Sequence, residues 1–291
     1  MASENSESAH DTSHKSVRTA ADEYELFRQR RNEMAVLPQG NLALLNTAWM
    51  LDPVGQWGDV WGAEGSWAAR EPSVGGVALR ADLSDGVTVN GEPVDGEITV
   101  FPRGSVHPSE ISFASGRTAT IIVNDDGQCG VRIWDAESDD IRNFGRIDAF
   151  DYSPDWVITG RFTPVEGGIH VQVEHLKDGG GTRDKVVPGE ITFSIAGVDY
   201  QPMAFVEGRA LMIVFSDATN GESTYSVGRF LLCAPNTDGT ITLDFNRAYL
   251  PPCAFNYNFN CPIPPLQNRF PFAVTAGEKN VLNESGELLH G

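Results

Sequence analysis

The chain has 291 residues, of which 40 are acidic and 21 basic, so its formal net charge at pH 7 is −19. A field of this sign repels nucleic acid and anionic membrane surfaces, and we exclude both as partners. No apolar run reaches the roughly 18 residues of a membrane-spanning helix. A hydrophobic content of 41% is that of a globular chain with a packed core.

Residues 1–18 are polar and lack the apolar segment of a signal peptide, which predicts a disordered tail and a cytoplasmic protein. The residues that follow carry helix signals. Thr19 and Asp22 have the spacing of a capping box, and an amphipathic helix is predicted over about residues 20–36. The apolar stretch 41–51 then forms either a second short helix or a buried strand.

From residue 57 onward the pattern is that of β-structure. Seven Asp-Gly or Asn-Gly pairs, which suit tight hairpin turns, separate short runs of alternating apolar residues. This pattern predicts a mainly β protein, built of antiparallel β-sandwich or barrel-like units with one N-terminal amphipathic helix. The runs are 87–89, 97–101, 118–123, 131–134, 156–162, 169–174, 190–195, 211–215, 225–232 and 240–245.

A polar segment at 136–155 suggests a boundary within the chain. We expect an N-terminal domain over 19–145, which holds the helix and a β unit, and a C-terminal β domain over 146–282. Residues 283–291 are predicted as a tail. One continuous folded unit is the alternative.

Residues 244–269 are the least ordinary stretch, with five prolines, five asparagines, two arginines and two cysteines. The prolines exclude a long helix or a central strand, so the polar residues must lie on an irregular ordered loop, where sites are often built. With the strand pair before it, the loop offers carboxylates, phenols and guanidinium groups for gripping an anion or for acid–base work. The candidate ligand-binding residues are Asp217, Thr219, Tyr225, Arg229, Asp244, Asn246, Arg247, Tyr249 and Asn268.

Three roles remain open for the cysteines of this loop, Cys253 and Cys261: a redox switch, a pair of soft metal ligands, or two small buried residues. The chain has no C-x-x-C pair and no H-E-x-x-H, G-x-S-x-G, P-loop or G-x-G-x-x-G motif. We therefore predict no metal and no cofactor. Four tryptophans form either an aromatic ligand platform or the packing of a small β domain: Trp49, Trp57, Trp61 and Trp67.

Over about residues 22–280 the chain resembles domain of unknown function 1684, a family of bacterial and archaeal proteins. The resemblance rests on FRQRRNEMAVLPQGNLALLNTAWML near the N-terminus, on FSDATNGESTYSVGRFL, and on the proline loop. An R-x-x-D-x-E-S motif, formed by Arg132, Asp135, Glu137 and Ser138, lies in the middle. The family implies a mostly β fold and supplies no activity.

Three functions follow as hypotheses. In the first, Arg229, Arg247 and Tyr225 bind a small polar or anionic molecule, with Asp217, Asp244 and Asn246 shaping the pocket. In the second, a hydrolase or isomerase uses Asp217 or Asp244 as general base beside Tyr225. In the third, the proline loop and the tryptophans form a structural or protein-interaction module. Asp244 paired with an arginine as a purely structural support of the loop is the alternative to all three. The sequence predicts no oligomeric state.

Overall fold

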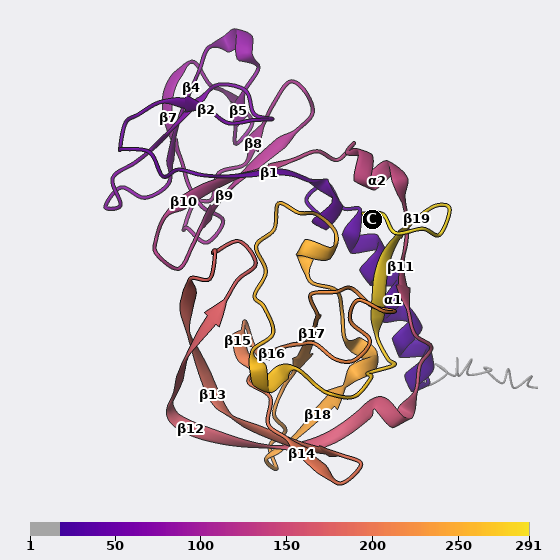
Figure 1. Cartoon of the computed structure of the whole chain (residues 1–291). Helices are drawn as coiled ribbons and strands as arrows, with labels where there is room; N and C mark the ends of the chain where they lie inside the picture. The colour runs from indigo at the N-terminus through magenta and orange to yellow at the C-terminus, as the bar shows by residue number, and fades with distance from the viewer. Residues whose placement is uncertain (1–17, 291) are drawn as a thin grey trace, which may run out of the picture.

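The computed structural model describes residues 18–290 (Figure 1). The fold is mainly β, as predicted, with several antiparallel sheets that include a half-barrel and with one long helix near the N-terminus. No helix in this part of the chain is long and apolar enough to cross a membrane.

The predicted capping box begins the first helix, α1 (Ala20–Ala35). The Thr19 hydroxyl accepts a hydrogen bond from the Asp22 amide at 3.2 Å, and the Asp22 carboxylate accepts one from the Thr19 amide at 2.9 Å. The apolar stretch after the helix is a single 3₁₀ turn followed by a strand, β1 (Leu44–Trp49).

The N-terminal β unit lies at the upper left of Figure 1 and contains two antiparallel sheets. One has the order β1-β10-β9-β8-β5-β6 and the other the order β2-β3-β4-β7. Their apolar faces meet in one core around Trp67 and Ile133. The strands after β1 are β2 (Gly58–Asp59), β3 (Ser66–Ala69), β4 (Val77–Ala81), β5 (Thr88–Val89), β6 (Glu92–Pro93), β7 (Gly96–Val100), β8 (Ile111–Ser112), β9 (Thr118–Val123) and β10 (Cys129–Trp134).

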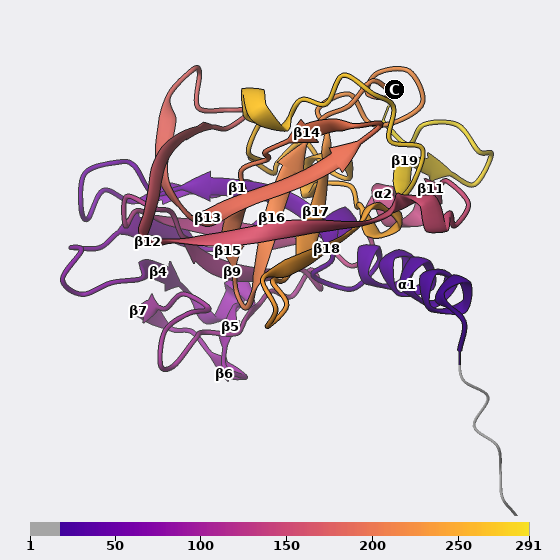
Figure 2. The same ribbon diagram turned by 90° about the horizontal axis from the view of Figure 1, so that it is seen from below.

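The C-terminal unit is built from a long hairpin and a three-stranded sheet. Seen from below, the sheet β14-β13-β12-β18 lies across the sheet β15-β16-β17 (Figure 2). Aromatic rings fill the core between them, with Phe193 and Phe270 centroids 5.6 Å apart. The strands are β12 (Val157–Glu174), β13 (Thr182–Ile195), β14 (Val198–Tyr200), β15 (Phe205–Glu207), β16 (Ala210–Phe215), β17 (Arg229–Cys233) and β18 (Thr240–Asp244).

Helix α1, which we expected within the N-terminal domain, packs instead on the pair β11 (Phe144–Ala149) and β19 (Glu278–Asn283). The Tyr24 hydroxyl donates to the Phe150 carbonyl at 2.6 Å. Arg31 grips the Glu278 carboxylate through two hydrogen bonds, of 2.6 and 3.0 Å. The link between β10 and β11 holds a short helix, α2 (Asp139–Asn143).

Residues 284–290, predicted as a tail, fold back onto β19. The Leu289 amide donates to the Val281 carbonyl at 2.9 Å, and the His290 ring lies 2.8 Å from the Phe255 carbonyl oxygen. The proline loop is also ordered, and it contains three 3₁₀ turns: Phe245–Arg247, Pro252–Ala254 and Leu266–Asn268.

Candidate functional site

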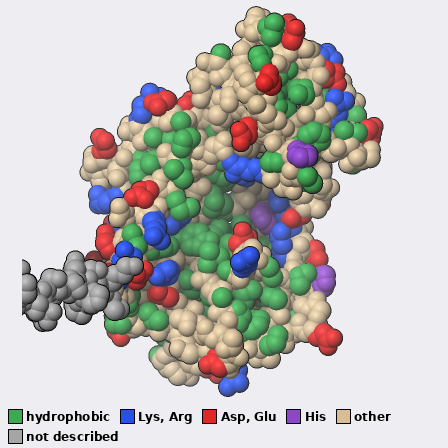
Figure 3. Space-filling model, turned by 180° about the vertical axis from the view of Figure 1, so that it is seen from behind, with side chains coloured by type: hydrophobic (Ala, Val, Ile, Leu, Met, Phe, Trp, Pro, Cys, Tyr) green, Lys and Arg blue, Asp and Glu red, His purple; other side chains and the backbone are tan. Residues whose placement is uncertain are grey.

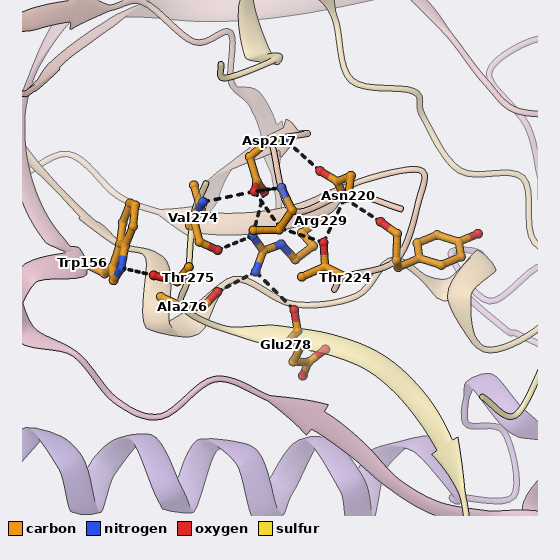
Figure 4. A network of polar contacts seen from close by, with 11 residues as sticks. Trp156, Asp217, Asn220, Thr224, Arg229, Val274, Thr275, Ala276 and Glu278 are labelled. Carbon is orange, nitrogen blue, oxygen red and sulfur yellow. Dashed lines mark hydrogen bonds and ion pairs between the residues drawn. The ribbon is translucent and has the colours of Figure 1, made fainter. Parts of the chain in front are cut away.

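Arg229 and Asp217 form a fully buried ion pair at the end of β16 and β17 (Figure 4). Both side chains are 0% exposed, and the Arg229 Nη2 to Asp217 Oδ2 distance is 2.7 Å. Arg229 also donates to the carbonyls of Val274, Ala276 and Glu278, at 2.8, 2.5 and 3.2 Å. Burial lowers the pKa of Arg229, and the charge of Asp217 opposes that shift. The guanidinium therefore fastens the strand entering β19 to the core.

Asp217 has no accepting capacity left for a ligand. Its Oδ1 accepts from the Thr219 amide at 2.9 Å, from the Thr219 hydroxyl at 2.7 Å and from the Val274 amide at 3.1 Å. The Thr219 hydroxyl lies in turn 2.9 Å from that of Thr224. Three of the predicted residues, Asp217, Thr219 and Arg229, are thus brought together. They form a buried structural network and not a surface site.

Asp244 and Arg247 lie apart from this network, on the first 3₁₀ turn of the proline loop. Arg247 Nε is 3.4 Å from Asp244 Oδ2, and 48% of the arginine side chain is exposed. The Arg247 guanidinium also lies 5.8 Å from the ring centre of Phe27 on α1. This pair matches the structural alternative, in which an ion pair supports the loop.

The two predicted asparagines are buried and bind mainly backbone groups, and Asn246 also donates to the Asp244 carboxylate at 2.9 Å. Asn246 accepts from the Ser153 amide and donates to the Ser153 carbonyl, both at 2.9 Å. Asn268 accepts from the Met203 amide at 2.7 Å and donates to the carbonyls of Met203 and Val214 at 2.8 and 2.7 Å. Each amide satisfies buried backbone groups of the irregular loop and its neighbours.

The two predicted tyrosines also have internal partners. The Tyr225 hydroxyl donates to the Cys253 carbonyl at 3.3 Å, and the Tyr249 hydroxyl lies 3.8 Å from the sulfur of Met212. Burial raises the pKa of Tyr225 and raises that of Tyr249 to about 12. Both phenols are neutral at physiological pH and are poor acids.

Cys253 and Cys261 adjoin one another in the buried part of the loop. The Cys253 amide lies 3.3 Å from the Cys261 sulfur, and both are free thiols. The hydrogen bond between the thiols holds the pKa of Cys253 below its ordinary value and raises that of Cys261. Residues 18–290 contain no group of three His, Cys, Asp or Glu side chains arranged to hold a metal ion.

A cleft of about 1010 Å³ lies where the two β units meet. Strands β1, β9 and β10 form one wall, and the turn end of the β12–β13 hairpin with the proline loop forms the other. The junction of the two units is also hollowed on the face seen in Figure 3, with Lys and Arg side chains at its border. Polar and charged side chains lining the cleft are Thr47, Asn124, Asp125, Asp126, Gln128, Arg132, Lys177, Asp178, Thr182, Arg183, Asp184, Lys185, Asn258 and Asn260.

Arg132 and Thr47 are the unusual members of this lining. They are directly paired across β10 and β1. Arg132 Nε and Thr47 Oγ1 are both buried, and neither has a hydrogen-bond partner in the described chain. The Arg132 guanidinium lies 5.2 Å from the ring centre of Phe259 and forms no ion pair within residues 18–290. Burial lowers its pKa, and the nearby charge of Arg103 lowers it further.

The other cations of the cleft differ in how they are paired. Lys185 lies 2.8 Å from an Asp125 oxygen, and Arg183 binds the Asp178 carboxylate at 2.8 and 2.9 Å. Lys177 is exposed and has no ion-pair partner among the described residues. Arg132 and Lys177 thus have no carboxylate within ion-pair distance in the described chain, whereas Asp126 and Asp184 line the same cleft without a Lys or Arg partner.

The R-x-x-D-x-E-S motif divides between two places. Arg132 faces the cleft, whereas Asp135 pairs with Arg117 at 3.3 Å and Ser138 caps α2 by accepting from the Ile141 amide at 3.2 Å. Arg132 belongs to the motif of the family resemblance but was not among the residues predicted to bind a ligand. One feature of the sequence could have indicated it: Arg132 lies inside a run predicted as a strand, and that strand contains no acidic residue to pair with it.

The comparisons with known proteins give a family without an activity. The family model described as "Protein of unknown function (DUF1684)" matches residues 142–279. The solution NMR structure of an uncharacterized protein from Haloarcula marismortui is 34% identical, with 47% of this chain and 77% of that chain covered and a TM-score of 0.39. No curated protein matches the chain.

Proposed function

The chain belongs to the DUF1684 family of proteins of unknown function, and from the geometry of the cleft we propose that it binds a small anionic molecule there. Arg132, opposite Thr47 on the cleft wall, is the residue that holds the anion, and Lys177 adds a second positive charge. The proposal keeps the predicted ligand class and moves the site from the C-terminal cluster to the junction of the two units.

The observation that carries the proposal is the unpartnered guanidinium of Arg132. Removing a charge from water costs several kcal/mol unless a counter-charge and hydrogen bonds offset it. Arg132 has an aromatic ring beneath it and no carboxylate, and its Nε–H has no acceptor. A phosphate or carboxylate group in the cleft would bind the Nη atoms of the guanidinium, which are not among its buried atoms, and would supply the missing counter-charge.

The contrast with Arg229 supports this choice of arginine. Arg229 has a carboxylate at 2.7 Å and three carbonyl acceptors, so an incoming anion would have to displace these partners. The Nε atoms of both arginines are buried without a partner, but Arg132 has no carboxylate or carbonyl acceptor in the described chain, and its side chain lines the cleft. A preorganised donor without a partner contributes most to affinity, because no existing hydrogen bond or ion pair has to be broken before the ligand binds.

The hydrolase or isomerase alternative has no comparable support. One of its two predicted general bases, Asp217, is 0% exposed and is occupied by Arg229, Thr219 and Val274, so a substrate cannot reach it without opening the core. The other, Asp244, pairs with Arg247 and accepts from Asn246 outside the cleft. Tyr225 is neutral and bound to a carbonyl. No step of a reaction is therefore assigned to these residues.

A thermal-shift measurement with inorganic phosphate tests the proposal. Phosphate is titrated against chloride at equal ionic strength, and a ligand at ~100 times its dissociation constant stabilises by ~2.7 kcal/mol. Wild type should gain melting temperature with phosphate, and Arg132→Ala should gain none. Arg247→Ala is the matched control, since it removes an exposed guanidinium outside the cleft and should respond like wild type.

Two results would contradict the proposal. One is a phosphate response in Arg132→Ala equal to that of wild type. The other is a response lost in Arg247→Ala and kept in Arg132→Ala, which would return the site to the C-terminal loop. The melting temperature of each variant in chloride alone shows whether its fold is intact.

A further inference from the structure

Resting on the proposed anion site, we infer the class of its ligand: an anion that carries a planar aromatic ring, with Trp49 as the platform for the ring. The anionic group sits at Arg132, and the ring lies beside it along the neighbouring strand. The inference comes from the placement of Trp49 and Gly130 on the wall of the cleft.

Trp49 stands on the same face of β1 as Thr47. Side chains two residues apart on a strand point to the same side and are separated by roughly 7 Å. Across the pair of strands, Thr47 is opposite Arg132 and Trp49 is opposite Gly130. The anion grip and the indole are therefore neighbours on one surface, and both line the cleft.

Gly130 explains why the indole lies flat on that surface. A Cβ atom at this position would come 2.7 Å from Trp49 Cε3 and 3.1 Å from its Cδ2 and Cζ3 atoms. The indole thus covers the bare backbone of the glycine, and any larger residue would lift it away. Trp49 keeps 36% of its surface exposed, so the face turned from the backbone is open to the cleft.

The rest of the wall suits a ligand that is apolar at one end. Leu51, Ile122 and Val123 also line the cleft, next to the tryptophan. An aromatic ring placed on an indole gains an offset-stacked or edge-to-face contact beyond its burial, equivalent to about a tenfold gain in affinity. Phosphate monoesters and carboxylates of aromatic compounds share this chemistry.

A matched pair of ligands tests the ring separately from the anion. Phenyl phosphate and methyl phosphate are titrated by isothermal calorimetry into wild type, Trp49→Ala and Trp61→Ala. Wild type should bind phenyl phosphate about tenfold more tightly than methyl phosphate. Trp49→Ala should bind the two equally. Trp61→Ala is the control, because Trp61 is 68% exposed and does not line the cleft, and it should keep the preference.

Two further variants guard against a local loss of structure. Trp49→Phe retains a ring and should keep most of the preference, whereas Gly130→Ala displaces the indole and should lose it. If wild type binds both phosphates equally and Arg132→Ala binds neither, the aromatic inference is overturned and the anion site stands. If Trp49→Ala keeps the tenfold preference, the inference is overturned as well. If wild type binds neither phosphate, the anion site itself is refuted.

Discussion

Replacing Arg229 by methionine should cost about 3–5 kcal/mol of folding free energy, because it breaks a buried ion pair by removing one partner. The side chain of Asp217 is 0% exposed and would be left without its counter-ion. Three carbonyls, those of Val274, Ala276 and Glu278, would lose a donor as well. The total free energy of unfolding of an ordinary domain is only about 5–15 kcal/mol, so this loss would be a large part of it.

Urea unfolding followed by circular dichroism measures this cost as a lower urea concentration at the midpoint of unfolding. The slope of the unfolding free energy against urea concentration should stay the same. Arg247→Met is the control, since its ion pair with Asp244 is half exposed and should be worth only about 0–1 kcal/mol. The double variant Asp217→Leu with Arg229→Met should lose less than the sum of the two single variants, because no charge remains buried. A loss below about 1 kcal/mol for Arg229→Met would refute the structural role assigned to this pair.

Two more predictions concern stability. Glu278→Ala leaves Arg31 of α1 without its carboxylate partner and should destabilise the fold by about 3 kcal/mol. An unchanged urea midpoint would exclude a role for the pair in docking the helix. Burial, aided by Arg183, lowers the pKa of His175 below its ordinary 6.5, so its contribution to stability is complete above pH 6.5 and falls as the pH drops below that value. His175→Gln should flatten the decline in stability between pH 7 and 5 seen for wild type, and equal slopes would contradict the assignment.

The fold class and the first helix were predictable because their signals are local. The capping box of Thr19 and Asp22 fixes where α1 begins, and the Asp-Gly and Asn-Gly turns mark the hairpins. The run 225–232 shows where local pattern failed. Strand β17 begins only at Arg229, so Tyr225 precedes the strand and does not belong to it.

The candidate site was less predictable, for a tertiary reason. Whether an arginine is a structural clamp or an open donor depends on which groups the fold brings to it, and Arg229 meets carbonyls 45 to 49 residues away. Arg132 meets Thr47 only through the register of β10 with β1. The register of two strands and the contact between the two units are not determined by a local sequence pattern. The types of residue at the site were therefore predictable, but their positions in the fold were not.

The most direct test of the anion site is a crystal of the protein soaked in selenate, with the anomalous signal of selenium locating the ion. The strongest peak should lie in the cleft, at a position that puts a selenate oxygen within hydrogen-bond distance, about 2.7–3.2 Å, of the Arg132 guanidinium. Selenate sites found only elsewhere on the molecule, with the cleft empty, would contradict the central claim.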